Sequence, residues 1–412
     1  MNVLIVNSPF KSIPVESTGA IERTVFHIVK QFSRLNKRNL NIYLLTRVKT
    51  KKFLSVKRDF PNVRIISLPE YDIKYIDSPI YVSEGLFKYM EDLVRIRGML
   101  LRLLKKKEIH IVHFHEPMSA FLFLQLFKRY DLPQRILTLH NFPMLYYIIN
   151  SKLFPVKYKL WKSLFLPIEK ILYKCVTHVS VVNPIFSSYL SIYSPAIRVY
   201  YSPLGVDTNL FHPNKRNSSI GNRILKKLNL EKFKGKYVLY VGRVEYLKGV
   251  DLLVSVANKL SRKIPFVIVG SGTYLKNMLS IVKKSRRAGQ FYFLGSINWR
   301  FLPYIYASAC CLILPSRAEG FPQVILEAMA SGIPVITTEV VKYLGIIKQN
   351  ENGIIVRTND INGLAEAITY VVENEKIRKK MGECARKKVV KEYTWEHVAE
   401  RFLRLYRKIL NN

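Results

Sequence analysis

Two glutamates, Glu319 and Glu327, lie eight residues apart in a stretch whose pattern suits the binding of a phosphorylated sugar. An apolar strand pattern precedes the stretch and an apolar helix pattern follows it. Pro322 suits the first helical turn and Gly332 the helix end, where the backbone often becomes left-handed. Glu319 is therefore expected in the loop before the helix, and Glu327 near the end of its second turn. A helix N-terminus attracts anions, so flanking acids can hold sugar or ribose hydroxyls while the helix end faces phosphate.

A second motif joins two cations to a glycine turn. Gly242–Gly249 follows the strand pattern Tyr237–Val241 and contains Arg243 and Lys248. Arginine can donate to two phosphate oxygens at once, whereas lysine contributes a compact positive charge. The motif therefore favours a phosphate site, and the alternative is an ordinary basic loop in a very basic chain.

A third turn, Gly270–Ser271–Gly272, follows the strand pattern Phe266–Val269. A single Gly-x-Gly of this kind is weak evidence, because it is also typical of a tight connection between a strand and a helix. The turn therefore supports a phosphate site only in combination with the other motifs.

Histidines end two strand patterns in the first half of the chain. His140 follows Ile136–Leu139, at the kind of strand end where open α/β sheets bind ligands, although a lone histidine there is usually structural. His113 and His115 alternate and so face the same way, but no third ligand has convincing spacing. We therefore expect no metal site.

Strand and helix patterns alternate along the chain, which indicates parallel sheets with crossover helices. The alternation restarts after residues 200–205, and prolines cluster between Pro203 and Pro213. We predict an α/β protein with two doubly wound, Rossmann-like domains that face a central cleft. The predicted segments are residues 1–203, residues 204–394, and a C-terminal segment at residues 395–412, in which an amphipathic helix pattern runs from Trp395 to Leu410.

The chain has 412 residues and a net charge of +37, which is spread over both halves. No zinc-finger spacing or RNA-recognition motif accompanies this charge, so nucleic acid is not an expected partner. No apolar run approaches the roughly 18 residues that span a bilayer, and the N-terminus does not look like a signal peptide. The four cysteines have no paired spacing, which suits a reducing compartment. We therefore expect a cytoplasmic protein.

Aromatic and basic residues alternate in two parts of the first half, a composition that suits an anionic membrane surface. An ordinary solvated face is the alternative. We expect peripheral binding to the inner face of a membrane. The two clusters are Phe87, Lys88, Tyr89, Arg95, Arg97, Arg102 and Lys105 to Lys107, and Tyr146, Tyr147, Lys152, Phe154, Lys157, Tyr158, Lys159, Trp161 and Lys162.

The stretch from Ser316 to Gly332, with the Gly242–Gly249 motif, closely resembles the signature of the retaining GT-B glycosyltransferases of family 4. This resemblance implies transfer of a sugar from a nucleotide-sugar donor with retention of configuration, without a metal or other cofactor. It implies an acceptor that is a glycan, a lipid-linked molecule or a small molecule. The implied catalytic residues are Glu319, His140, Arg243 and Lys248. The implied donor-binding residues are Gly19, Arg243, Lys248, Gly270, Gly272, Leu294, Glu319, Gly320, Phe321, Pro322, Val324 and Glu327.

By this resemblance, Glu319 contacts the sugar hydroxyls and steadies developing positive charge, and Glu327 holds the ribose. Arg243 and Lys248 stabilise the leaving diphosphate, while His140 contacts the transferred sugar. The chain departs from the family pattern at Ala20, where a second glycine is usual, at Leu204 and at residues 340–345. A nucleotide-sugar epimerase on the same fold and a non-catalytic binding protein remain as alternatives.

Overall fold

The computed structural model describes residues 1–7, 12–13, 20–35, 40–48, 60, 62–68, 79–105, 108–140 and 155–411. The chain divides into two compact units, each with its own sheet. Unit 1 comprises Met1–Leu204 and Trp395–Asn412, and unit 2 comprises Gly205–Thr394.

The sheet of unit 1 is parallel in every pairing described, with the order β2-β3-β1-β5-β6-β7-β8 and with β4 beside β3. Its central strands are buried along their length, as expected of parallel strands that helices cover on both faces. The strands are β1 (Asn2–Val6), β2 (Ser12–Ile13), β3 (Asn41–Val48), β4 (Val63–Leu68), β5 (Ile111–Phe114), β6 (Gln134–Leu139), β7 (His178–Val181) and β8 (Arg198–Tyr201).

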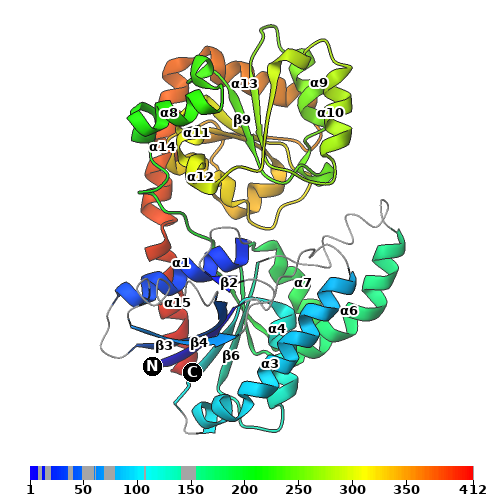
Figure 1. The fold of residues 1–412 in the computed structure, drawn as a ribbon, viewed down its shortest axis with the longest axis vertical. Coiled ribbons are helices and arrows are strands. Elements are labelled where there is room, and N and C mark those ends of the chain that lie inside the picture. Colours follow the sequence, from blue (N-terminus) through cyan, green and yellow to red (C-terminus); the bar gives the residue numbers. More distant parts are fainter. Residues whose placement is uncertain are drawn as a thin grey trace. The chain divides into compact units, whose positions relative to one another are not determined.

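Helix α15 (Trp395–Leu410) packs with α1 (Ala20–Arg34) in the core of unit 1, and the red helix of Figure 1 lies among the blue N-terminal elements. The buried residues of α15 recur at helical spacing and include Val398, Phe402, Leu405 and Ile409, so the predicted amphipathic helix is confirmed. The remaining helices are α3 (Pro79–Lys105), α4 (Pro117–Phe127), α6 (Pro155–Cys175) and α7 (Ile185–Tyr193). Helix α4 contacts both α3 and α6.

The sheet of unit 2 has the parallel order β11-β10-β9-β12-β13-β14, in which the first strand of the unit lies at the centre. The chain runs outward from β9 through β10 to β11, and then resumes at β12 on the other side of β9. The strands are β9 (Val238–Val241), β10 (Phe266–Val269), β11 (Phe291–Gly295), β12 (Cys311–Leu314), β13 (Val335–Thr338) and β14 (Gly353–Val356).

Helices cover both faces of the sheet in unit 2. In Figure 1, α9 and α10 lie to the right of β9, and α11, α12 and α14 lie to its left; contacts join α9 to α13 and α12 to α14. The α-helices are α8 (Ser219–Lys227), α9 (Leu252–Lys259), α10 (Leu275–Lys283), α11 (Leu302–Ala307), α12 (Gln323–Ala330), α13 (Ile361–Glu373) and α14 (Glu375–Glu392). The 3-10 helices are η2 (Pro213–Asn217), η3 (Glu231–Phe233), η4 (Tyr246–Lys248), η5 (Ala288–Gln290), η6 (Trp299–Phe301) and η7 (Glu339–Leu344).

These two parallel sheets with interleaved helices confirm the predicted α/β class with two Rossmann-like domains. The edge strands β2, β8 and β14 were not predicted from the sequence. β8 is half-exposed, so its residues lack the continuous apolar run of a buried strand. No helix in the described part of the chain is both long and apolar enough to cross a bilayer.

Candidate active site

The loops after β9 and β12 lie at the point where the strand order of the unit 2 sheet reverses. In open α/β sheets, ligands bind outside the carboxyl ends of the strands at such a point. The loop after β9 contains Gly242, Arg243 and Lys248, and the loop after β12 contains Glu319. The fold therefore brings the two strongest sequence motifs to neighbouring strands.

Lys248 and Glu319 form an ion pair, although 71 positions separate them in the sequence. Lys248 Nζ donates to Glu319 Oε1 over 2.7 Å, and Ser316 Oγ donates to the same oxygen over 2.7 Å. The side chains are only 19% and 6% exposed, so solvent screens their attraction little. An ammonium group has three N–H donors, and a cation held in this way can also donate to phosphate oxygens.

Gly249 allows the loop of Lys248 to lie against the end of β12. Its φ of +67° is in the left-handed region, and a Cβ there would lie 1.9 Å from the carbonyl oxygen of Pro315. Glycine is the residue that meets both conditions without strain. This close backbone approach is one reason why Lys248 can reach Glu319.

Arg317 joins the same two loops and was missed by the sequence analysis. Its guanidinium donates to both carboxylate oxygens of Asp251 over 2.7 Å and lies 4.0 Å from the centre of the Tyr246 ring. Its backbone N–H donates to Leu247 O over 2.8 Å. A two-pronged bond of this kind fixes geometry as well as adding energy. Arg317 and Asp251 therefore hold the Lys248 loop in place.

Arg243 pairs with a nearer acid. Its guanidinium is 63% exposed and lies 2.6 Å from Glu245 Oε1. The carbonyl oxygen of Arg243 accepts from the Tyr240 hydroxyl over 2.6 Å, which anchors the backbone of this residue. An exposed arginine on an anchored backbone can exchange its partner carboxylate for a phosphate at little cost.

The Gly270–Gly272 turn packs directly on the Gly242 loop. A Cβ on Gly270 (φ +133°) would lie 1.8 Å from Gly242 O, and one on Gly272 would lie 2.3 Å from Val244 O. Gly242 N donates to Val269 O over 3.0 Å, which joins the two strand ends. Packing between loops therefore accounts for both glycines. Leu294 is half-buried where the register between β10 and β11 shifts.

Helix α12 starts one residue later than predicted. Pro322 is its N-cap, with φ −79° and ψ 91°, and the first helical residue is Gln323. Proline at this point has an extended backbone, so it precedes the first turn and does not belong to it. Phe321 and Pro322 are buried, while Gly320 and Val324 are half-exposed.

Glu327 is also held by a specific partner. The Tyr306 hydroxyl of α11 donates to Glu327 Oε2 over 2.8 Å, and Glu327 is 8% exposed. Tyr306 itself is fully buried, so the hydroxyl that holds this carboxylate has a fixed position.

Three histidines lie together at the carboxyl edge of the unit 1 sheet. His115 Nδ1 and His140 Nε2 are 3.1 Å apart, and the rings of His113 and His115 are 4.2 Å apart. Burial lowers the pKa of His140 to about 4 and that of His113 to about 3, with a further effect of His140 on His113. Burial likewise lowers the pKa of His115 well below its usual value. All three rings are therefore neutral at neutral pH.

Glu116, which follows His115, caps helix α4. Its carboxylate accepts from the backbone N–H groups of Met118 and Ser119 over 2.9 and 2.6 Å. Among the described residues, no group of three or more His, Cys, Asp or Glu side chains is placed to hold a metal ion. Gly19 lies outside the described residues, and Ala20 begins α1.

Family models match both units of the chain. The glycosyl transferases group 1 model matches residues 222–388, and the glycosyltransferase family 4 model matches residues 21–210. The chain is 26% identical to a 2-deoxystreptamine N-acetyl-D-glucosaminyltransferase of Niallia circulans over 73% of this chain and 77% of that enzyme. It is 31% identical to an uncharacterized glycosyltransferase of Methanocaldococcus jannaschii, over 42% of this chain and only 45% of that protein.

Solved structures share the fold over the whole chain. Sucrose-phosphate synthase from Thermosynechococcus elongatus matches with a TM-score of 0.77 at 22% identity, covering 100% of this chain and 99% of that one. Anabaena HepE, solved in complex with UDP-glucose, matches with a TM-score of 0.67 at 14% identity, covering 99% of this chain and 100% of that one. Two Rossmann-like units with these neighbours define the GT-B class. Together with the two family models, this places the chain in the family 4 glycosyltransferases.

Proposed function

We propose that this protein transfers a sugar from a nucleotide-sugar donor to an acceptor hydroxyl with retention of anomeric configuration. The observation that carries the proposal is the Lys248–Glu319 pair at the reversal point of the unit 2 sheet. A cation and a carboxylate held side by side match two adjacent parts of a nucleotide sugar, namely the diphosphate and the sugar hydroxyls. The complex of Anabaena HepE with UDP-glucose supports this class of donor.

In the proposed reaction, the bond between the anomeric carbon and the diphosphate oxygen breaks, and the nucleoside diphosphate leaves with the electron pair. The acceptor oxygen bonds to that carbon on the same face, and its proton passes to the leaving phosphate. Lys248 and Arg243 stabilise the negative charge on the diphosphate, and one such charge partner typically lowers the barrier by about 3 kcal/mol. Glu319 lies against the sugar and steadies positive charge at the anomeric carbon.

The remaining predicted residues receive binding roles. Glu327, fixed by Tyr306, holds the ribose hydroxyls. The neutral His140 ring hydrogen-bonds to the transferred sugar. In this proposal Lys248 and Arg243 supply the positive charge next to the diphosphate that a divalent ion supplies elsewhere, so we propose transfer without a metal or other cofactor.

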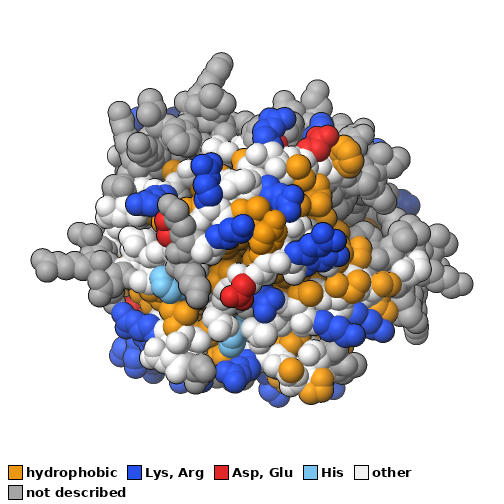
Figure 2. Space-filling model, turned by 90° about the horizontal axis from the view of Figure 1, so that it is seen from below, with side chains coloured by type: hydrophobic (Ala, Val, Ile, Leu, Met, Phe, Trp, Pro, Cys, Tyr) orange, Lys and Arg blue, Asp and Glu red, His pale blue; other side chains and the backbone are white. Residues whose placement is uncertain are grey.

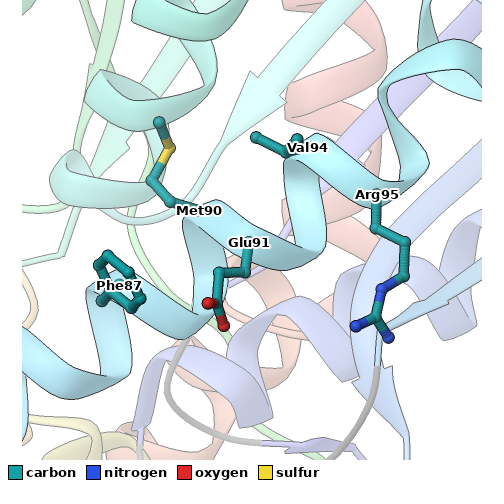
Figure 3. Close-up of a pocket in the computed structure, with 5 residues that line it drawn as sticks. All are labelled: Phe87, Met90, Glu91, Val94 and Arg95. Carbon is teal, nitrogen blue, oxygen red and sulfur yellow. The ribbon is translucent and has the colours of Figure 1, made fainter.

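We further propose a lipid-linked or membrane-proximal acceptor, and that the protein docks reversibly on anionic membranes. Helix α3 supports this, because Phe87 and Val94 are 67% and 54% exposed beside Arg95. With Met90 and Glu91, these side chains line an open hollow of about 490 Å³ (Figure 3). Figure 2 shows Lys and Arg side chains among exposed hydrophobic ones on one face of the molecule, with few acids.

In the first predicted surface cluster, Lys106 and Lys107 lie outside the described residues, and Tyr89 is not on the surface. Tyr89 is only 1% exposed, because residues two positions apart on a helix point to opposite sides and Phe87 takes the outer one. In the second cluster, residues 146–154 and the side chains of Lys157, Tyr158, Lys159, Trp161 and Lys162 lie outside the described residues.

Incubation with a panel of nucleotide sugars and candidate acceptors, with detection of free nucleoside diphosphate and of glycosylated product, tests the proposal. A glycosyltransferase releases the diphosphate and forms product from at least one donor. An epimerase converts the donor and releases little diphosphate, and a binding protein releases none. Either of these two results contradicts the proposed function.

A further inference from the structure

The contact between His115 and His140 follows from the pairing of their strands. β5 and β6 are parallel neighbours, with His113 opposite Ile136. Side chains at alternate positions of a strand share a face, so His113 and His115 face the same side, as do Thr138 and His140. His113 Nε2 lies 2.7 Å from Thr138 Oγ1, and His115 Nδ1 lies 3.1 Å from His140 Nε2. His113 of β5 thus contacts Thr138 of β6, and His115 and His140, which directly follow these two strands, contact each other.

Helix α15 packs against His113 and His115 through Tyr406 and Phe402. The Tyr406 hydroxyl lies 2.6 Å from His113 Nδ1, so both nitrogens of His113 have partners. The Phe402 ring lies 5.0 Å from that of His113 and 6.3 Å from that of His115. His115 is 1% exposed and its ring stacks on that of His140 at 5.4 Å. The imidazole of His115 therefore has little room to turn.

The protonation of His115 sets what His140 can offer a ligand. A neutral imidazole has one N–H donor and one bare acceptor nitrogen. If His115 Nδ1 carries the proton, His140 Nε2 accepts it, and the proton of His140 is on Nδ1. If His115 Nδ1 is bare, His140 Nε2 must donate, and His140 Nδ1 becomes an acceptor.

The other nitrogen of His115 decides between these two arrangements. Nε2 is buried and has no hydrogen-bond partner in the part of the chain that the structure describes. A buried N–H without an acceptor is the rarer and more costly kind of unsatisfied group. The proton of His115 therefore belongs on Nδ1, where it has a partner, and His140 carries its proton on Nδ1.

We propose that His115 is a positioning residue, which holds His140 in the tautomer that donates from Nδ1 to an oxygen of the transferred sugar. This inference rests on the proposed function, because it assigns the sugar to His140. His115 itself acts only through His140. The contacts of His113 with Thr138 and Tyr406 hold the His113 ring in place, and this ring packs against that of His115.

Two substitutions of His115 separate this role from simple packing. His115→Phe keeps an aromatic ring but removes both nitrogens, whereas His115→Asn keeps an amide N–H near the position of Nδ1. We expect His115→Phe to lower kcat about tenfold, or roughly 1.4 kcal/mol of barrier, with an unchanged KM for the donor. His115→Asn should keep most of the wild-type kcat. His178→Phe on neighbouring β7, also buried, is the matched control and should leave kcat unchanged.

A double variant tests whether His115 acts through His140. In a His140→Ala background, His115→Phe should cause no additional loss of kcat. A second full tenfold loss there would show that His115 acts independently of His140 and would overturn the inference. Wild-type kcat in His115→Phe would also overturn it.

The tautomer can be measured without any activity. Nitrogen-15 NMR of labelled histidines should show the His140 proton on Nδ1 in the wild type and a shift of the population to Nε2 in His115→Phe. A His140 proton on Nε2 in the wild type would contradict the inference. This readout stands even if no donor in the panel is turned over, so failure of the inference and failure of the proposed function are distinguishable.

Discussion

Two donors hold the carboxylate of Glu319 by a single oxygen, and the proposed function places this carboxylate against the sugar. Lys248 and Ser316 both bond to Oε1, each over 2.7 Å. These bonds orient the plane of the carboxylate, and its negative charge is largely buried. The same lysine links the carboxylate to the diphosphate in the proposed complex.

Glu319→Gln keeps the shape of the side chain but removes its negative charge. We expect turnover to fall at least about tenfold, roughly 1.4 kcal/mol of barrier, while affinity for the nucleoside diphosphate changes little. Steady-state kinetics and calorimetric titration measure the two quantities. Glu373→Gln, an exposed acid paired with Arg262, is the control. If turnover persists while affinity collapses, Glu319 serves the nucleotide and not the sugar.

The buried histidines make stability depend on pH. His113, surrounded by Thr138, His115, Phe402 and Tyr406, has a pKa of about 3 in the folded protein. An unfolded histidine takes up a proton near pH 6.5, so the unfolded state binds more protons below that value. The stability that the neutral His113 contributes is fully present above about pH 6.5. The folded protein loses it progressively as the pH falls towards about 3.

Urea titrations of the wild type and His113→Phe at about pH 7 and about pH 5.5 measure this effect. Between these values the wild type should lose about 1 kcal/mol more of its free energy of unfolding than the variant, because the variant has no proton to take up at this site. The variant itself starts from a lower stability, since Tyr406 and Thr138 lose a partner. Equal losses in the two proteins would contradict a depressed pKa for His113.

At the scale of elements, the site depends on how closely the loops after neighbouring strands approach one another. Gly249 lies against Pro315, and the Gly270 turn lies against Gly242. Arg317 then bonds to Asp251 across the same junction. The loops are therefore fixed relative to β9 and β12 before any ligand binds, which lowers the entropy cost of binding.

Gly249→Ala should destabilise the protein by more than about 1 kcal/mol, because alanine is strained at positive φ and its methyl would meet Pro315 O. It should also weaken nucleoside diphosphate binding, since Lys248 is the preceding residue. Gly289→Ala is the control, because no atom lies within 4 Å of its added Cβ. Thermal unfolding and calorimetric titration measure both effects. Wild-type stability and affinity in Gly249→Ala would show that the close approach of Gly249 to Pro315 does not position Lys248.

For the whole molecule, hydrophobic periodicity was enough to predict the two Rossmann-like sheets and the bounds of the helix at Trp395–Leu410. Local motifs likewise placed Lys248 and Glu319 on loops after strands. Contacts between distant residues could not be predicted in this way. The bonds from Arg317 to Asp251 and from His115 to His140 depend on strand order, which brings together residues 66 and 25 positions apart.

The fold also decides which side chains of the proposed membrane surface are accessible, because Phe87 is exposed and Tyr89 is buried. We expect the protein to sediment with vesicles that contain anionic phospholipid at low salt, and to be released at high salt because screening weakens the attraction. Phe87→Ser with Arg95→Glu should reduce this binding. Tyr343→Ser in unit 2, equally exposed at 67%, is the control. Failure of the wild type to sediment at low salt would leave a soluble acceptor as the better proposal.

In the proposed function, Lys248 at the reversal point of the unit 2 sheet holds the diphosphate of the donor. The direct measurement is calorimetric titration of the wild type, Lys248→Met and Lys388→Met with a set of nucleoside diphosphates. Lys388 is a matched control, because it is 15% exposed and pairs with Glu392 on α14. We predict that the wild type and Lys388→Met bind at least one nucleoside diphosphate alike, and that Lys248→Met binds it at least about tenfold more weakly, roughly 1.4 kcal/mol. Equal affinity in all three proteins, or no binding to the wild type, would contradict the account.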